Sequence, residues 1–305
     1  MRNLNLSQRI REAAERGDSF AQFQLAIDLE YGNSGEQDFQ RASEWYAKAA
    51  NRGHQVAEGN FLLQQVLGQT KVSEPGEVFA RVKARAASGD LGAANDLGLC
   101  YQFGYGTPVS YEDAEVCFRR AATGGLSTAQ FNLGGFYFDG KGVEKNLSLA
   151  AEWYTRAAEQ RDELALVKLA SMYQKGIGVD LDPGHAAVLY LLAYRLGSVR
   201  AACHLGFMFK KGLGVERDDS LAYALYLESV SGPDTPDIRE EISYRGTAFY
   251  WLGYMAEHGE GVRRDLRTAK RWYRRGAACG QSNCIEAVAR LRPGAARECR
   301  LSERT

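Results

Sequence analysis

The sequence has little proline, no net charge and no long hydrophobic run, and each shortage excludes a class of protein. Only 6 of the 305 residues are proline and 45% are hydrophobic, which excludes collagen-like and disordered chains. The 38 basic side chains balance 38 acidic ones, so the basic excess of a general nucleic-acid binder is missing. The longest apolar run, Ala186 to Tyr194, is far shorter than the roughly 20 residues of a membrane-spanning helix. We therefore predict no nucleic-acid partner and no membrane insertion.

Side chains that carry catalysis or hold metals are also few. The 4 histidines are dispersed, with no His-Glu-x-x-His arrangement, and the 6 cysteines include no Cys-x-x-Cys pair. Cys203 and His204 are adjacent, but neighbouring residues on a helix point about 100° apart and do not face each other as nucleophile and base. We predict no enzymatic activity, no small-molecule substrate, no cofactor and no metal.

The N-terminus lacks the pattern of a signal peptide. Arg2, Asn3 and Asn5 interrupt it, and Gln8 and Arg9 follow before any apolar segment. The scattered thiols also favour a reducing compartment. We expect a cytoplasmic location if Met1 is the native start, and a periplasmic one stays open if it is not.

Glycine, by contrast, is abundant, with 33 residues, and it recurs at a fixed spacing. A Leu-Gly or Leu-Ala pair returns every 36 residues, at Leu97, Leu133, Leu169 and Leu205. A Gly-x-Gly loop follows each pair, and a fifth loop at Gly259 comes 47 residues after the one at Gly212, which indicates an 11-residue insertion near 231–241. An alanine opens every unit: Ala21, Ala57, Ala93, Ala129, Ala165, Ala201 and Ala248. The period predicts seven units over 21–283.

Each unit is predicted to form two antiparallel helices. In the fourth unit Ala129, Leu133 and Tyr137 recur at helical spacing, and the small Gly134 lets another backbone approach closely. Asn146 is of an N-cap type and would open the second helix. Equivalent residues in other units are Asp38, Ser110, Asp182, Asp218 and Asp265. The second unit is degenerate, with Phe61-Leu62 in place of Leu-Gly, so we expect its helices to survive and its turn to differ.

Half-units in the same register flank the seven. We predict an N-terminal capping helix within 1–20 and a C-terminal capping helix and tail within 284–305. The fold class is then all-α, a single solenoid domain over 1–305 made of about seven two-helix repeats with half-repeat caps.

The repeated pattern of Ala, Leu-Gly, Tyr, Gly-x-Gly-Val, Asp, Ala, Trp-Tyr, Ala-Ala and Gly resembles the Sel-one-like repeat (SLR) family of tetratricopeptide-like α-solenoids. The resemblance covers about residues 10 to 291. It implies a right-handed superhelix that serves as an adaptor or scaffold for a partner protein. Bacterial members also include immunity proteins that neutralise secreted toxins. A cysteine-rich branch, proposed to hydrolyse cell-wall intermediates, joins the two helices of a repeat by a disulfide; only Cys100 and Cys117 could imitate that bridge.

The Gly-x-Gly loops do not predict a phosphate site. A phosphate-binding loop needs Gly-Lys-Ser/Thr or Gly-x-Gly-x-x-Gly between a strand and a helix, whereas these loops join two helices and lack both endings. We interpret them as structural turns.

The resemblance places the binding groove on the exposed face of each first helix. Matching the Leu-Gly pair carries that role to Phe23, Ile27, Asn95, Leu99, Gln102, Phe131, Phe138, Val167, Gln174, Phe207, Lys210, Tyr250, Tyr254 and Glu257. Several are apolar, and an exposed apolar patch often marks an interaction site. Burial against neighbouring repeats is the alternative explanation.

The seventh unit is the most basic part of the chain. Arg267, Arg271, Arg274 and Arg275 fall on one helical face, which predicts a positive stripe. A solvated outer face is one interpretation, and a dock for an acidic partner protein is the other. The insertion, Ser231 to Asp237, is a loop whose Pro236 could start a longer helix, and it is either a spacer or part of a binding face.

Overall fold

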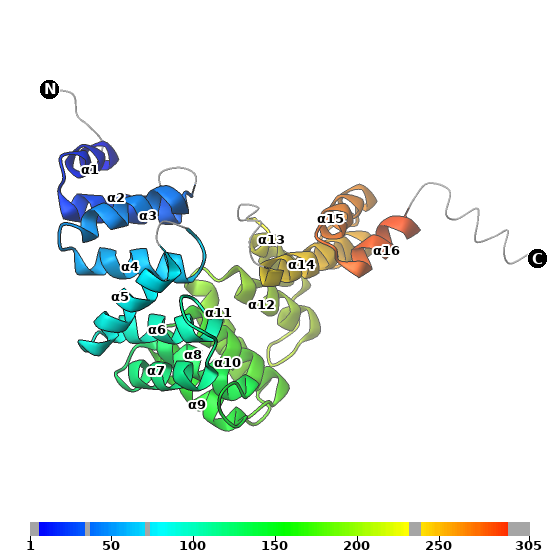
Figure 1. The fold of residues 1–305 in the computed structure, drawn as a ribbon. Coiled ribbons are helices and arrows are strands. Elements are labelled where there is room, and N and C mark those ends of the chain that lie inside the picture. Colours follow the sequence, from blue (N-terminus) through cyan, green and yellow to red (C-terminus); the bar gives the residue numbers. More distant parts are fainter. Residues whose placement is uncertain (1–5, 34–36, 71–73, 232–238, 292–305) are drawn as a thin grey trace, which may run out of the picture. The chain divides into compact units, whose positions relative to one another are not determined.

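The computed structural model describes residues 6–33, 37–70, 74–231 and 239–291, and these residues form α-helices without any β-strand. The helices follow one another in pairs (Figure 1). The first helices of the seven units are α2 (Ser19–Tyr31), α4 (Gln55–Val66), α6 (Leu91–Phe103), α8 (Ser127–Asp139), α10 (Glu163–Lys175), α12 (Val199–Lys211) and α14 (Arg239–His258). The second helices are α3 (Phe39–Ala50), α5 (Pro75–Ala87), α7 (Tyr111–Thr123), α9 (Leu147–Glu159), α11 (Pro183–Arg195), α13 (Asp219–Ser229) and α15 (Leu266–Ala278). They are flanked by α1 (Leu6–Glu15) and α16 (Ser282–Arg290).

Short polar side chains set where the helices begin. The carboxylate of Asp182 accepts the backbone N–H of His185 at 2.9 Å, and Asp218 accepts that of Leu221 at the same distance. Each bond satisfies one of the amides that a helix N-terminus leaves without a partner. The N-caps predicted for the second helices at Asp38, Ser110, Asp182, Asp218 and Asp265 all accept such a bond. The starts of these second helices were therefore predictable from the sequence, and α9 begins at Leu147, directly after the predicted N-cap residue Asn146.

The small residue of the Leu-Gly pair lies under an aromatic ring of the paired helix. A Cβ atom added at Gly98 would stand 2.7 Å from the Phe118 ring, and one at Gly253 would stand 2.6 Å from that of Tyr273. The rings at this position are fully buried: Tyr46, Phe118, Tyr154, Tyr190, Tyr226 and Tyr273. The repeated glycine is thus needed for close packing of the two helices around one core ring.

The second glycine of each Gly-x-Gly loop joins one unit to the preceding one. At Gly142 the backbone has φ +65°, and an added Cβ would stand 2.5 Å from the carbonyl oxygen of Tyr111, at the start of α7. The same approach occurs at Gly106, Gly178, Gly214 and Gly261, each against the first turn of the preceding second helix. The loop is therefore a structural turn, as predicted, and its second glycine packs against the preceding repeat. We call this contact between two repeats the seam.

The chain divides into two compact units, Met1–Asn146 and Leu147–Thr305. Within each, every helix contacts the next along the chain. First helices also contact first helices of neighbouring repeats: α4 contacts α6, α12 contacts α14, and α14 contacts α16. In the second compact unit α12 and α14 therefore lie side by side, and we call the surface that these two helices form the first-helix face. The single domain over 1–305, with caps in 1–20 and 284–305, stays a prediction.

The degenerate second unit keeps both helices, α4 and α5. Most of the predicted insertion, residues 232–238, and the C-terminal tail from 292 lie outside the described residues. The helix after the insertion, α14, has 20 residues where most first helices have 13, as the sequence predicted. In the described part of the chain no helix is long and apolar enough to cross a bilayer.

Candidate interaction surface

The predicted groove residues all lie on first helices, and none of them is fully exposed. Ten are half-buried: Phe23, Ile27, Leu99, Gln102, Phe131, Phe138, Gln174, Phe207, Tyr250 and Tyr254. Four are buried: Asn95, Val167, Lys210 and Glu257. Contacts with neighbouring helices, described below, account for much of this burial, so the set separates into residues that hold the repeats together and residues that still present area to solvent.

In three units the residue at one first-helix position accepts a hydrogen bond from the core tyrosine 16 residues later. The Tyr190 hydroxyl donates to Gln174 Oε1 at 3.2 Å, and the Tyr273 hydroxyl donates to Glu257 Oε2 at 2.9 Å. Glu30, at the same offset in the first unit, accepts from Tyr46. A buried tyrosine needs such a partner. Gln174 and Glu257 therefore have a structural role inside their own repeats.

Glu257 also joins the last repeat to the C-terminal flank. Its carboxylate accepts a bond from Arg290 on α16 at 2.7 Å, and its backbone carbonyl accepts one from Arg264 Nε at 3.0 Å. Burial raises the pKa of Glu257, but the hydrogen bonds from Arg290 and Tyr273 outweigh that effect and hold the pKa below its ordinary value. The carboxylate is thus ionised and engaged.

Lys210 has a comparable role between the sixth and seventh units. Its ammonium lies 3.1 Å from Asp219 Oδ1 and 2.6 Å from Glu260 Oε2, and Arg217 lies on the other side of Asp219. Burial lowers the pKa of Lys210, but the two carboxylates raise it further, so the side chain stays charged. Glu260 belongs to a Gly-x-Gly loop, so this ion cluster reinforces the seam there.

Two asparagines tie neighbouring first helices together in the first compact unit. Asn132 on α8 donates to Asn95 Oδ1 on α6 at 2.9 Å. Asp96, next to Asn95, is buried, and burial raises its pKa to about 7, although a hydrogen bond from Asn95 opposes the shift. Asn132 and Asp96 were not predicted, because the alignment on Leu-Gly selected the positions beside them.

In the second compact unit the predicted groove aromatics come together around a residue that the sequence did not single out. Trp251 lies 6.1 Å from Phe207, 5.4 Å from Tyr250 and 5.6 Å from Tyr254, measured between ring centroids. Lys211 lies 5.2 Å from the Trp251 ring. We call Phe207, Tyr250, Trp251 and Tyr254 the aromatic cluster. All four are half-buried, so each side chain keeps part of its area exposed to solvent.

The aromatic groove residues of the first compact unit are dispersed. Phe23 stacks on His54, the N-cap residue of α4, with centroids 4.5 Å apart. Phe138 lies under Lys145, whose ammonium is 6.0 Å from the ring centroid. These contacts resemble packing between successive elements more than a shared surface.

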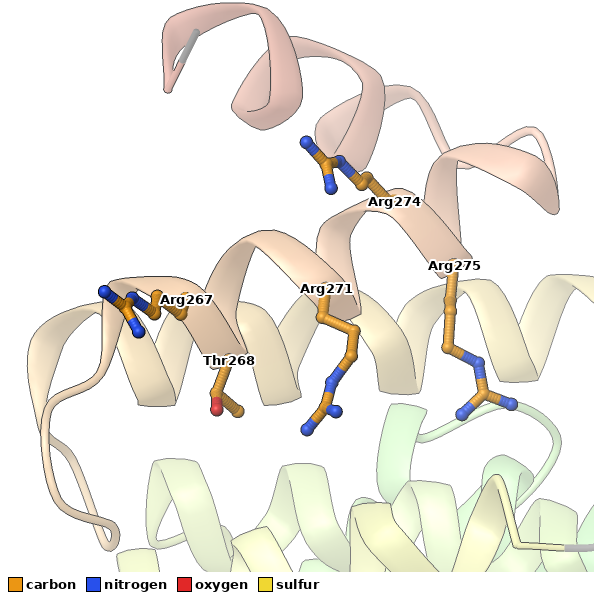
Figure 2. Close-up of a pocket in the computed structure, with 5 residues that line it drawn as sticks. All are labelled: Arg267, Thr268, Arg271, Arg274 and Arg275. Atoms are coloured by element: carbon orange, nitrogen blue, oxygen red, sulfur yellow. The ribbon is translucent and has the colours of Figure 1, made fainter. Parts of the chain in front are cut away.

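All four arginines of the predicted basic stripe are exposed. Arg267, Arg271, Arg274 and Arg275 line, with Thr268, a hollow of about 510 Å³ on α15 (Figure 2). Arg275 lies 4.6 Å from the Phe249 ring and 5.4 Å from the Trp272 ring. The structure thus places all four arginines on the exposed part of α15, a second helix.

A second exposed surface, on α11, was not predicted. Val188, Leu191, Leu192 and Leu196 are 40–54% exposed and recur at helical spacing. The signal is present in the sequence as apolar residues at both the buried and the outer positions of this helix, within the longest apolar run.

The described residues hold no cluster of His, Cys, Asp or Glu that could bind a metal ion. Cys100 and Cys117 are free thiols. Burial raises the pKa of Cys203 to about 12, and its sulfur lies 3.6 Å from the Tyr244 carbonyl oxygen. His204 instead stacks on Tyr190 at 4.7 Å. The His204 ring also lies 5.3 Å from the Tyr244 ring, so both residues contact Tyr244, the cysteine at its backbone carbonyl and the histidine at its ring.

The sequence profile of the Sel1 repeat matches residues 19–54, 92–126, 127–162, 164–198, 199–232 and 248–281, more than half of the chain. The chain belongs to the Sel1 repeat family. The unmatched second unit is the one that the sequence marked as degenerate, although the structure gives it both helices. The family assignment and the helical-repeat solenoid fold predicted from the glycine spacing are confirmed.

Solved structures share this fold. The chain is 29% identical to a protective antigen of uropathogenic Escherichia coli strains that displays an SLR fold, with a TM-score of 0.68 over 95% of this chain and 59% of that one. It is 26% identical to a Sel1 repeat protein from Oxalobacter formigenes, with a TM-score of 0.66 over 94% and 80% of the two chains. A putative sel1-like repeat-containing protein of Acanthamoeba polyphaga mimivirus is 36% identical over 67 residues, which are 22% of this chain and 13% of the viral protein.

Proposed function

We propose that this Sel1 repeat protein is a non-catalytic scaffold that binds a partner protein on its first-helix face, with the aromatic cluster of α12 and α14 as the main contact. The observation that carries the proposal is the convergence of Phe207, Tyr250, Trp251 and Tyr254, all half-buried, on one surface. Tyrosine and tryptophan dominate binding energy at protein interfaces, because they bury large areas at a small entropy cost.

The polar contacts of the same two helices support the proposal. Glu257 is held by Tyr273 on α15, and Lys210 is held by Asp219 on α13 and by Glu260 in the loop after α14, so α12 and α14 are both fixed to their neighbours. Side chains fixed in this way lose little freedom when a partner binds, so less of the interaction free energy is spent on ordering.

The experiment is affinity purification of the tagged full-length chain, followed by quantitative mass spectrometry. Tyr254→Ala removes a ring of the cluster, and Tyr223→Ala on α13 is the matched control. Both tyrosines are half-buried and pack on the same core, so the two substitutions should destabilise the fold to a similar extent, but only Tyr254 belongs to the aromatic cluster. We expect one stoichiometric partner that Tyr254→Ala loses at least tenfold and Tyr223→Ala retains.

Equal retention by both variants would refute binding at the cluster. Turnover of a defined substrate that survives loss of the cluster would refute the scaffold role. The immunity hypothesis concerns the kind of partner, and recovery of a toxic enzyme whose activity this chain blocks would establish it.

A further inference from the structure

Four exposed arginines lie close together on α15. Five arginines elsewhere in the described residues form ion pairs with carboxylates: Arg81 with Glu58, Arg85 with Asp90, Arg119 with Glu115, Arg217 with Asp219 and Arg290 with Glu257. Within the described part of the chain, no ion pair involves Arg267, Arg271, Arg274 or Arg275. We call these four the arginine row.

The carboxylates nearest in sequence to the arginine row are already engaged. Asp265 caps α15: it accepts the backbone N–H of Arg267 at 2.9 Å and the hydroxyl of Thr268 at 2.6 Å. Glu260, in the loop before α15, binds Lys210, and Glu257 on α14 is held by Tyr273 and Arg290. The guanidinium groups of the row therefore stay available to an external anion.

Folding does not explain the row. Like charges four residues apart on a helix, such as Arg267 with Arg271 and Arg271 with Arg275, repel and destabilise it by about 0.2–0.5 kcal/mol per pair. The helix packs through its other side, where Ala269, Tyr273 and Gly276 are buried. An external anion would remove the repulsion.

The geometry fits a row of carboxylates. Successive arginines at i and i+4 rise about 6 Å along the helix, and the row spans about 12 Å. Figure 2 shows Arg271 and Arg275 extending from one side of α15 and Arg274 from the other edge, around the hollow that Thr268 also lines. Contact with Phe249 and Trp272 orients Arg275, so one guanidinium is fixed in advance.

We propose that the arginine row binds an acidic segment of a partner protein whose carboxylates are spaced about 6 Å apart, as at i, i+4 and i+8 of a helix. Guanidinium groups bind carboxylates through paired, charge-assisted hydrogen bonds. A nucleic acid fits less well, because the row is one helix long and the rest of the chain adds no net positive charge. This surface lies on a second helix, so the proposal shares with the proposed function only the premise that the ligand is a protein.

The test is fluorescence anisotropy of the full chain with a labelled 16-residue helical peptide that carries glutamates at i, i+4 and i+8. The triple variant Arg267→Gln, Arg271→Gln, Arg274→Gln removes three of the four guanidinium groups of the row and keeps Arg275, which packs on Phe249 and Trp272. A matched control, Arg120→Gln, Lys168→Gln, Arg195→Gln, removes the same charge from exposed positions elsewhere. We expect the triple variant to weaken binding at least tenfold and the control to stay within twofold. Circular dichroism checks that both variants keep their helices.

Two results would overturn the proposal. One is equal weakening by the triple variant and the control, which would show a net-charge effect. The other is tighter, row-dependent binding of a 12-nucleotide oligothymidylate than of the peptide, which would make the site one for phosphates. Tyr254→Ala separates the two proposals, because it should leave peptide binding unchanged whether or not the first-helix face binds a partner.

Discussion

Replacing Gly142 by alanine should destabilise the seam between the third and fourth repeats. Two costs add at this position. The backbone has φ +65°, a left-handed conformation that costs a residue with a Cβ atom about 1–2 kcal/mol. The new Cβ would also stand 2.5 Å from the carbonyl oxygen of Tyr111, a backbone atom that cannot rotate away. Such overpacking costs about 1–3 kcal/mol, so we expect a total of roughly 2–5 kcal/mol.

Gly68 provides a matched control within the same compact unit. Its φ is +69°, but an added Cβ would have no neighbour within 4 Å. Gly68→Ala should therefore show only the conformational cost, about 1–2 kcal/mol. The difference between the two variants isolates the contact at the seam.

Urea unfolding of the full chain, followed by circular dichroism at 222 nm, measures this difference. A difference of about 2 kcal/mol corresponds to an unfolding midpoint roughly 1 M lower for Gly142→Ala, given typical slopes of the transition. Repeat stacks unfold in parts, so the midpoint of the affected transition is the quantity to compare. Equal midpoints for the two variants would refute the interpretation of Gly-x-Gly as a contact between repeats.

Three further predictions concern buried ionisable groups. Burial lowers the pKa of His204 to about 4, against 6.5 in the unfolded chain. Because only the unfolded chain binds the proton between these values, the protein should lose about 3 kcal/mol of stability as the pH falls from 6.5 to 4. His204→Gln should flatten this pH dependence in urea titrations at several pH values. Burial raises the pKa of Asp96 to about 7, so its effect on stability has the opposite pH dependence: stability is lost as the pH rises from 3.8 to 7. Asp96→Asn should therefore stabilise the protein by up to about 4 kcal/mol at pH 7.5 and by nothing below pH 3.8, which calorimetry at the two pH values measures. Glu257→Ala should lower stability by about 2 kcal/mol by leaving Tyr273 without an acceptor, and an unchanged melting temperature would contradict that.

Much of the fold was predictable because the signals that determine the helices of each repeat lie within that repeat. Asp182 and Asp218 are good N-caps wherever a helix follows, and Gly98 signals close packing whichever ring covers it. Because these local signals recur every 36 residues, chance does not account for them. The hydrogen bonds and ring contacts between repeats were harder to predict from the sequence.

The candidate surface was only partly predictable for the same reason. Alignment on the Leu-Gly pair finds equivalent positions, but it does not show what each side chain reaches. Gln174 and Glu257 were assigned to the groove, yet they accept bonds from tyrosines that lie 16 residues later. Trp251 was passed over because it stands one position beside Tyr250, and only the structure shows that it joins three other rings.

Site-specific photo-crosslinking tests most directly the central claim that the first-helix face receives a partner protein. A benzophenone amino acid replaces Tyr254 on α14 in one full-length variant and Tyr223 on α13 in the other, and each is irradiated in cells. We expect a covalent adduct with one partner protein from position 254 and none from position 223. An adduct only from position 223, or no adduct from either in cells where the affinity-purified partner is present, would contradict it.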